Sequence, residues 1–194
     1  MNNLKIKVVL SSIRENRFGD KPAKWIADLA SKVPGFEVEV LDLKDYQLPM
    51  FAEAVSPAYV TGEYSKPEVN KWAGKVADAD GFIFVIPEYN HSFPSSLKNN
   101  LDYLHRELIN KPLCVVAYGS VGGARAIEQL RLVAIELQMA SIRNSVHIMN
   151  PWLLTEADGS LKAGVLDGYV KPAEGMLSQF SWWANALKDA RNKK

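Results

Sequence analysis

The chain has 194 residues, which is the usual size of one domain and leaves little room for a second. Hydrophobic residues make up 47% and charged residues 23%, so the composition excludes a disordered chain. The 23 Lys and Arg nearly balance the 22 Asp and Glu, and a net charge of +1 lacks the positive field that drives non-specific nucleic-acid binding. We therefore expect a single domain over residues 1–194 with no nucleic-acid partner.

Cysteine content and hydrophobic runs bear on the compartment. Cys114 is the single cysteine, so an intramolecular disulfide and a thiolate zinc cluster are both excluded. The first apolar run is shorter than the core of a signal peptide, and no later run approaches the roughly 20 apolar residues of a membrane span. We expect a cytoplasmic protein without membrane contact.

Strands and helices alternate along the first half of the chain. The first strand ends at Leu10, and apolar residues at helical spacing predict a helix over 18–32, with Pro22 tolerated in its first turn. Residues 36–40 alternate apolar and charged side chains, which is typical of an edge strand with one wet face. Residues 45–67 lack a sustained period, so we expect an irregular segment that covers another part of the molecule.

The second half continues the alternation. Trp72, Val76 and Ala79 predict a helix, and the five consecutive apolar residues 82–86 predict a strand with protein on both faces. The next helix carries its apolar side at Leu97, Leu101, Leu104 and Leu108. The remaining elements are expected at 113–117 (strand), 127–137 (helix), 141–149 (strand) and 169–190 (helix).

This order predicts a parallel sheet with helices on both faces. The first, third and fourth strands are solidly apolar, the second alternates and the fifth is mixed. A strand order of 2-1-3-4-5 places these strands correctly at the centre and the edges of the sheet. We expect an α/β, three-layer flavodoxin-like fold, with ligands at the carboxyl ends of the first and third strands, where the strand order reverses.

The loop after the first strand, residues 11–19, carries groups that bind phosphate. Ser11 and Ser12 supply hydroxyls. Arg14 and Arg17 supply guanidinium groups, and the next helix supplies free N–H groups. The glycine-rich motifs of nucleoside-triphosphate and dinucleotide sites are absent from it. In the alternative interpretation, Ser12 caps the helix and the arginines are solvated surface charges, but the position of the loop favours phosphate.

Two more loops follow the third and fourth strands. Residues 87–94 contain two prolines that stiffen the backbone, whose amides, with Tyr89 alongside, can face the polar edge of a flat ring. A rigid turn in which Asn90 and Ser92 cap the next helix is the alternative. Residues 118–125 contain three glycines, which either let the backbone approach a ligand or form a tight turn.

Three runs resemble the NADPH-dependent FMN reductase family of flavodoxin-like proteins. They are SSIR after the first strand, PEYNHSFPSSLKNNLDYL from Pro87, and YGSVGGARA from Tyr118. The resemblance covers most of the chain in order, and the middle run is highly specific. It implies a noncovalently bound FMN, reduced by NADPH or NADH and reoxidised by a small-molecule acceptor such as a quinone, an azo dye, a metal ion or free flavin.

The resemblance also implies which residues bind FMN. The phosphate loop would comprise Ser12, Arg14, Arg17, Phe18 and Gly19. The loop around the isoalloxazine ring would comprise Pro87, Glu88, Tyr89, Asn90 and Ser92. The third loop would comprise Tyr118, Gly119, Ser120, Gly122 and Gly123. The family usually has glycine where this chain has Ser11 and Ser95, which leaves the backbone geometry at these two positions open.

Hydride transfer between a nicotinamide and a flavin needs no protein acid, base or nucleophile, because the cofactor carries the chemistry. We therefore expect no catalytic side chain. The three histidines lack metal-ligand spacing, so no metal site is expected, and Cys114 within an apolar strand is expected to pack as a small hydrophobe. The resemblance implies a homodimer or homotetramer, whereas Trp182 and Trp183 are expected to pack against the sheet.

Two alternatives to the reductase remain. A flavodoxin-type electron carrier would hold FMN without nicotinamide turnover, but proteins of that kind are usually strongly acidic, unlike this chain with its charge of +1. A regulatory domain with the same fold would bind no flavin. No residue pattern distinguishes NADPH from NADH or identifies the physiological acceptor.

Overall fold

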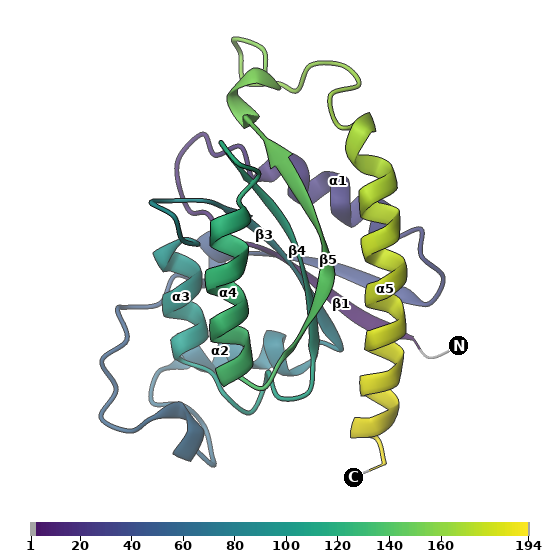
Figure 1. Ribbon diagram of the computed structural model, residues 1–194. Coiled ribbons are helices and arrows are strands. Elements are labelled where there is room, and N and C mark those ends of the chain that lie inside the picture. The colour runs from purple at the N-terminus through teal and green to yellow at the C-terminus, as the bar shows by residue number, and fades with distance from the viewer. Residues whose placement is uncertain (1–2, 194) are drawn as a thin grey trace.

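Five parallel strands form one sheet in the order β2-β1-β3-β4-β5 in the computed structural model, which describes residues 3–193 (Figure 1). The strands are β1 (Leu4–Leu10), β2 (Phe36–Asp42), β3 (Gly81–Pro87), β4 (Pro112–Gly119) and β5 (Ala140–Met149). Between β1 and β3 the strand order reverses, so the loops that follow these two strands diverge from the carboxyl edge of the sheet. The strand order and its parallel pairing confirm the predicted fold class.

Helices cover both faces of the sheet. One face carries α1 (Asp20–Ala30) and α5 (Asp167–Arg191), and the other carries α2 (Pro67–Ala77), α3 (Ser95–Asp102) and α4 (Ala124–Glu136) (Figure 1). Each face has its own hydrophobic core. Strand β3 shows why its apolar run is continuous: Phe82 and Phe84 enter the core beneath α2–α4, whereas Ile83 and Val85 enter the core beneath α1 and α5.

Helix α3 is shorter than the leucine spacing predicts. It ends at Asp102, although Leu104 and Leu108 are both buried. Two turns replace the last helical residues: the N–H of Leu104 donates to Leu101 O (3.0 Å), and that of Leu108 donates to His105 O (3.1 Å). Because such turns keep a helix-like period of burial, the spacing alone could not separate them from a continuing helix.

The long segment between β2 and α2 covers α3, as expected. Two buried asparagines of α3 hold it there. Asn99 accepts the N–H of Phe51 (2.8 Å) and donates to Pro49 O (2.8 Å), and Asn100 donates to Tyr46 O (2.8 Å). These side chains therefore satisfy backbone groups of a segment with little secondary structure of its own.

The expectation for the tryptophan pair on α5 is wrong for Trp182. Its side chain is 66% exposed, whereas Trp183 is partly buried against the core beneath α1 and α5. Successive residues on a helix point about 100° apart, and the core-facing stripe of α5 passes through Phe180 and Ala184. Only one ring of an adjacent pair can therefore lie beside that stripe.

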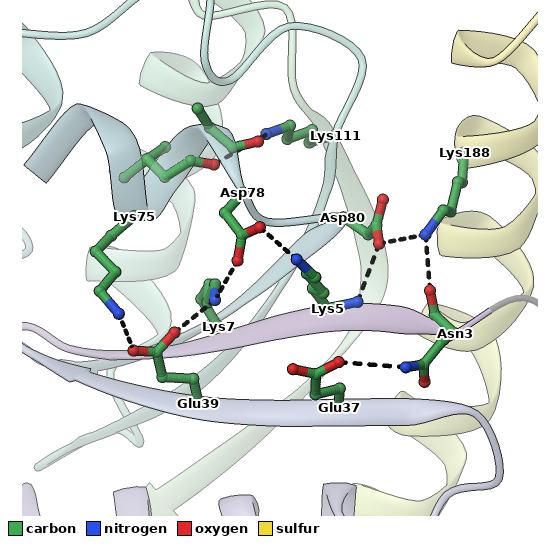
Figure 2. Close-up of polar contacts among 12 residues, drawn as sticks. Asn3, Lys5, Lys7, Glu37, Glu39, Lys75, Asp78, Asp80, Lys111 and Lys188 are labelled. Atoms are coloured by element: carbon green, nitrogen blue, oxygen red, sulfur yellow. Dashed lines mark hydrogen bonds and ion pairs between the residues drawn. The ribbon is translucent and has the colours of Figure 1, made fainter.

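A charged network lies on the face of β1 and β2 beside α2 and the turn that follows it (Figure 2). The ammonium of Lys7, buried in β1, donates to Glu39 of β2 (2.5 Å) and to Asp78 after α2 (3.0 Å). Lys5 also donates to Asp78 (2.6 Å), and Lys75 donates to Glu39 (2.5 Å). The network ties β1, β2 and the end of α2 together.

Replacing Asp78 with asparagine should make the protein less stable at pH 7 but not at low pH. Hydrogen bonds from Lys5 and then Lys7 hold the pKa of Asp78 below its ordinary value of 3.8. A depressed carboxyl pKa contributes stability above the unfolded-state pKa, and this is lost as pH falls through the folded-state value. Urea unfolding at pH 7, 5 and 3 should show the gap between wild type and Asp78→Asn closing toward pH 3.

The matched control for this prediction is Asp28→Asn, which removes an exposed carboxylate on α1. Its gap from wild type should be small at every pH. A gap for Asp78→Asn that stays constant from pH 7 to pH 3 would contradict the stabilising role of the network.

Candidate cofactor site

A cavity of about 480 Å³ lies at the carboxyl edge of the sheet. The loops that follow β1, β3 and β4 all border it, together with the first turns of α1 and the segment after β5. The bordering residues are Arg14, Asn16, Arg17, Phe18, Lys21, Pro87, Glu88, Tyr89, Tyr118, Gly119, Ser120, Pro151, Trp152, Thr155 and Gly159. Three loops far apart in the sequence thus meet at one cavity of the size that cofactor sites have.

Ser12 and Arg14 connect the first loop to the second. The hydroxyls of Ser12 and Tyr89 lie 2.8 Å apart, and the Arg14 guanidinium lies over the Tyr89 ring, 5.7 Å from its centroid. Ser12 is buried and does not cap α1, whose N-cap residue is Gly19. Arg14 is exposed and forms no ion pair within residues 3–193, so its charge is available to a ligand.

Arg17 also borders the cavity, but its guanidinium is already paired. It is 6% exposed and forms salt bridges with Asp42 at the end of β2 and Asp20 of α1. It also donates to Ser12 O (2.5 Å), and all three guanidinium nitrogens take part in these contacts. The hydrogen bond with Asp42 is the main cause of a raised pKa of Arg17. Arg17 therefore holds the backbone of the first loop against the end of β2.

Phe18 and Gly19 pack against Tyr118 at the start of α1. The rings of Phe18 and Tyr118 lie 5.2 Å apart, and a Cβ on Gly19 would lie 2.7 Å from the Tyr118 hydroxyl oxygen. Lys21 is a bordering residue that the sequence analysis missed. The available signal was its place as a basic residue in the first turn after a phosphate-type loop. The Lys21 ammonium forms no ion pair in the described part of the chain.

The second loop is a tight hairpin. Tyr89 and Ser92 exchange both backbone hydrogen bonds (2.8 and 3.0 Å), and the central residues Asn90 and His91 have φ values of 50° and 66°. Neither Asn90 nor Ser92 caps α3, because Pro94 is its N-cap residue. Both residues lie outside the cavity and shape the turn that presents Tyr89 to it.

Glu88 fastens the second loop to the third. Its side chain is 4% exposed and accepts from the Arg125 side chain (Nε, 2.6 Å) and backbone (3.1 Å) at the start of α4. Arg125 also contacts His91 Nε2 (2.8 Å), and the N–H of Glu88 donates to Tyr118 O (2.9 Å). No local pattern around Arg125 predicts this contact, because Glu88 lies 37 residues away.

The glycines of the third loop have two roles. Gly122 and Gly123 have φ values of 64° and 71°, and a Cβ on Gly123 would lie 2.5 Å from that of Ala117. They form the tight turn into α4 and do not border the cavity. Gly119 and Ser120 do border it, so the close approach of backbone to ligand applies to these two residues.

The two serines that replace family glycines leave the cavity open. Ser11 is buried and its hydroxyl donates to Val85 O (2.9 Å), so its side chain lies between β1 and β3. Ser95 is the exposed first residue of α3. Neither residue borders the cavity.

Cys114 packs as a small hydrophobe in β4, as predicted, and burial raises the pKa of its thiol well above the usual value. Within residues 3–193 there is no group of three His, Cys, Asp or Glu side chains that could hold a metal ion. Over the same residues, none of the helices has both the length and the apolar character needed to cross a bilayer.

The cavity suits a ligand with an anionic end and a flat polar ring. Arg14 and Lys21 border it without carboxylate partners. The Tyr118 hydroxyl is buried without a hydrogen-bond partner among the described residues, and burial raises its pKa above the usual range, so it remains a donor at neutral pH. This donor without a partner belongs to a residue that borders the cavity. The residues present therefore fit FMN.

Fold and site together define a flavin-binding protein of the flavodoxin-like class. The model of the NADPH-dependent FMN reductase family matches residues 4–152, which is most of the chain. The chain belongs to this family.

The relatives include curated enzymes of fungi and bacteria. An NAD(P)H-dependent FMN reductase of Schizosaccharomyces pombe is 38% identical over 135 residues, covering 70% of this chain and 68% of that protein. A quinone reductase of Escherichia coli K12 is 27% identical over 195 residues, covering 95% of this chain and 97% of that protein. Among solved structures, the flavoenzyme FerB of Paracoccus denitrificans matches with a TM-score of 0.74 at 21% identity, covering 95% and 98% of the two chains, and shows the shared fold.

Proposed function

We propose that the chain is an FMN-dependent NAD(P)H oxidoreductase, which passes hydride from the nicotinamide through bound FMN to a quinone, azo, metal-ion or flavin acceptor. The cavity carries this proposal. It lies where the strand order reverses, with unpaired cations at the first loop and an aromatic, glycine-containing wall at the second and third loops. The family membership supports the same reaction class.

The side chains of the first loop and α1 bind the phosphate end of the cofactor. Arg14 and Lys21 supply the charges, as charge-assisted hydrogen bonds to phosphate are the strong ones. Arg17 acts through the loop, because its contact with Ser12 O and Asp42 holds the backbone in place. Ser12 contacts Tyr89 of the second loop, and Phe18 and Gly19 pack against Tyr118 of the third loop, which holds the first loop beside the other two.

The second and third loops bind the ring. Bound FMN would be both the hydride acceptor for the nicotinamide and the electron donor for the second substrate. Tyr89, Gly119 and Ser120 would hold the ring, and backbone N–H donors of the third loop would stabilise negative charge on it. The Glu88–Arg125 pair keeps these amides in place, so little reorganisation accompanies the reaction. Asn90, Ser92, Gly122 and Gly123 set the shape of the two loops, and Pro87 and Tyr118 border them.

Assembly and compartment complete the proposal. A homodimer or homotetramer in the cytoplasm agrees with the single buried cysteine and with the exposed apolar side chains of the segment before α2, Met50 and Tyr59. The acceptor class includes quinones, since relatives of this chain are named quinone reductase and NADPH:quinone oxidoreductase. Either NADPH or NADH serves as the donor.

Purified protein tests the proposal through its flavin. The holoprotein should be yellow, NADPH or NADH should bleach it within seconds under anaerobic conditions, and a quinone or ferricyanide should restore the colour. Initial rates should give parallel lines, because the nicotinamide leaves before the acceptor binds. Protein that stays colourless after incubation with FMN would refute flavin binding, and FMN that neither nicotinamide reduces would favour the electron carrier.

A further inference from the structure

The segment after β5 forms a wall of the cavity that the family motifs do not include. Asn150 has a φ of 48°, and its N–H donates to Gly119 O (2.9 Å) of the third loop. The short 3-10 turn Pro151–Leu153 follows directly. Trp152 therefore borders the cavity next to the loop that contains Gly119 and Ser120.

Trp152 is unusual because it is both exposed and part of the cavity wall. Its side chain is 60% exposed, and its neighbour Leu153 is 59% exposed but does not border the cavity. An indole left in water at the rim of a binding site offers a large flat surface on which a second flat molecule can stack. A scattered exposed leucine needs no such explanation.

The turn that carries Trp152 is anchored to the body of the protein. Leu154 and Leu161 pack against the core beneath α1 and α5, and the N–H of Lys162 donates to Leu154 O (3.0 Å). A β-bridge between Thr155 and Leu161 closes the hairpin that follows. The backbone at Trp152 is thus held in place while its side chain remains open to solvent.

The other aromatic residues of the cavity differ from Trp152. Tyr89 is held by the Ser12 hydroxyl and by Arg14, and Tyr118 is buried against Phe18. Both rings are fixed by the protein before any ligand arrives, as a cofactor cradle requires. The indole N–H of Trp152 has no hydrogen-bond partner within residues 3–193, so this ring is free to adjust to molecules of different size.

We propose that Trp152 stacks on the planar electron acceptor and gives the enzyme its preference for quinone-type rings over compact inorganic acceptors. The inference rests on the proposed function, because it assigns a specificity residue to the second half of that reaction. Trp152 is a substrate-binding residue here: it contacts the acceptor and takes no part in electron or proton transfer.

The test uses FMN-saturated Trp152→Ala, Trp152→Phe and, as the matched control, Leu153→Ala. Steady-state rates at saturating NADPH compare 1,4-naphthoquinone with ferricyanide, which has no ring. Loss of one aromatic stack should lower the ratio of kcat/KM for the quinone to that for ferricyanide by about tenfold in Trp152→Ala, mostly through KM. Trp152→Phe should recover most of the ratio, and Leu153→Ala should match wild type.

Two further measurements separate this role from others. The FMN dissociation constant, from flavin fluorescence, and the oligomeric state, from sedimentation, should be the same in Trp152→Ala and wild type. An unchanged acceptor ratio, an FMN affinity that falls with it, or a change of oligomeric state would each overturn the proposal. Wild-type protein that reduces neither acceptor would refute the proposed function instead.

Discussion

Replacing Arg17 with alanine is expected to lower the free energy of unfolding by about 3 kcal/mol, because its buried guanidinium makes charge-assisted hydrogen bonds to two partly exposed carboxylates. Arg17 is 6% exposed and pairs with Asp42 and Asp20, and the Ser12 carbonyl would lose its donor as well. In a domain of this size the loss corresponds to roughly 6–12 °C in Tm. Urea unfolding of FMN-free protein measures the effect without a contribution from cofactor binding.

Arg14→Ala is the matched control for this experiment. It removes the same charge, but from an exposed residue that lies three positions before Arg17. Its free energy of unfolding should lie within about 0.5 kcal/mol of wild type, as is usual for surface substitutions. Equal decreases in the free energy of unfolding of the two variants would contradict the stabilising role of Arg17 in the first loop.

Arg14→Ala should instead weaken FMN binding by about one to two orders of magnitude, because a charge-assisted hydrogen bond to phosphate contributes roughly 1.5–3 kcal/mol. Arg14 borders the cavity and has no carboxylate partner in the described part of the chain. A titration that follows the quenching of flavin fluorescence gives the dissociation constant. Increasing salt should reduce the difference between the variants, since the contact is ionic.

The control for the cofactor experiment is Lys24→Ala on α1. Lys24 is exposed and lies outside the cavity, so its replacement changes the net charge of the protein equally but should leave the FMN dissociation constant within twofold of wild type. Riboflavin, which lacks the phosphate, should bind Arg14→Ala and wild type equally. An unchanged FMN affinity in Arg14→Ala would remove Arg14 from the phosphate site.

The two arginines of the first loop show where sequence reasoning reached its limit. Both are basic residues in the loop after the first strand, and the sequence predicts phosphate binding for both. Asp42, the partner that already pairs with the Arg17 guanidinium, lies 25 residues away at the end of β2. The strand pairing that brings Leu10 beside Asp42 decides this contact, and no local pattern around Arg17 reveals it.

The order of strands and helices, the buried character of the central strands and the loops that meet at the cavity all followed from the sequence. Apolar runs and their periods depend on burial, which is a property that each segment carries in its own residues. Tertiary structure decided which loop residues face the cavity. Only the packed molecule shows that Asn90, Gly122 and Gly123 shape turns, that Arg17 is paired, and that Lys21 and Trp152 border the cavity. These outcomes depend on contacts between residues far apart in the chain, where side-chain type alone does not determine the partner.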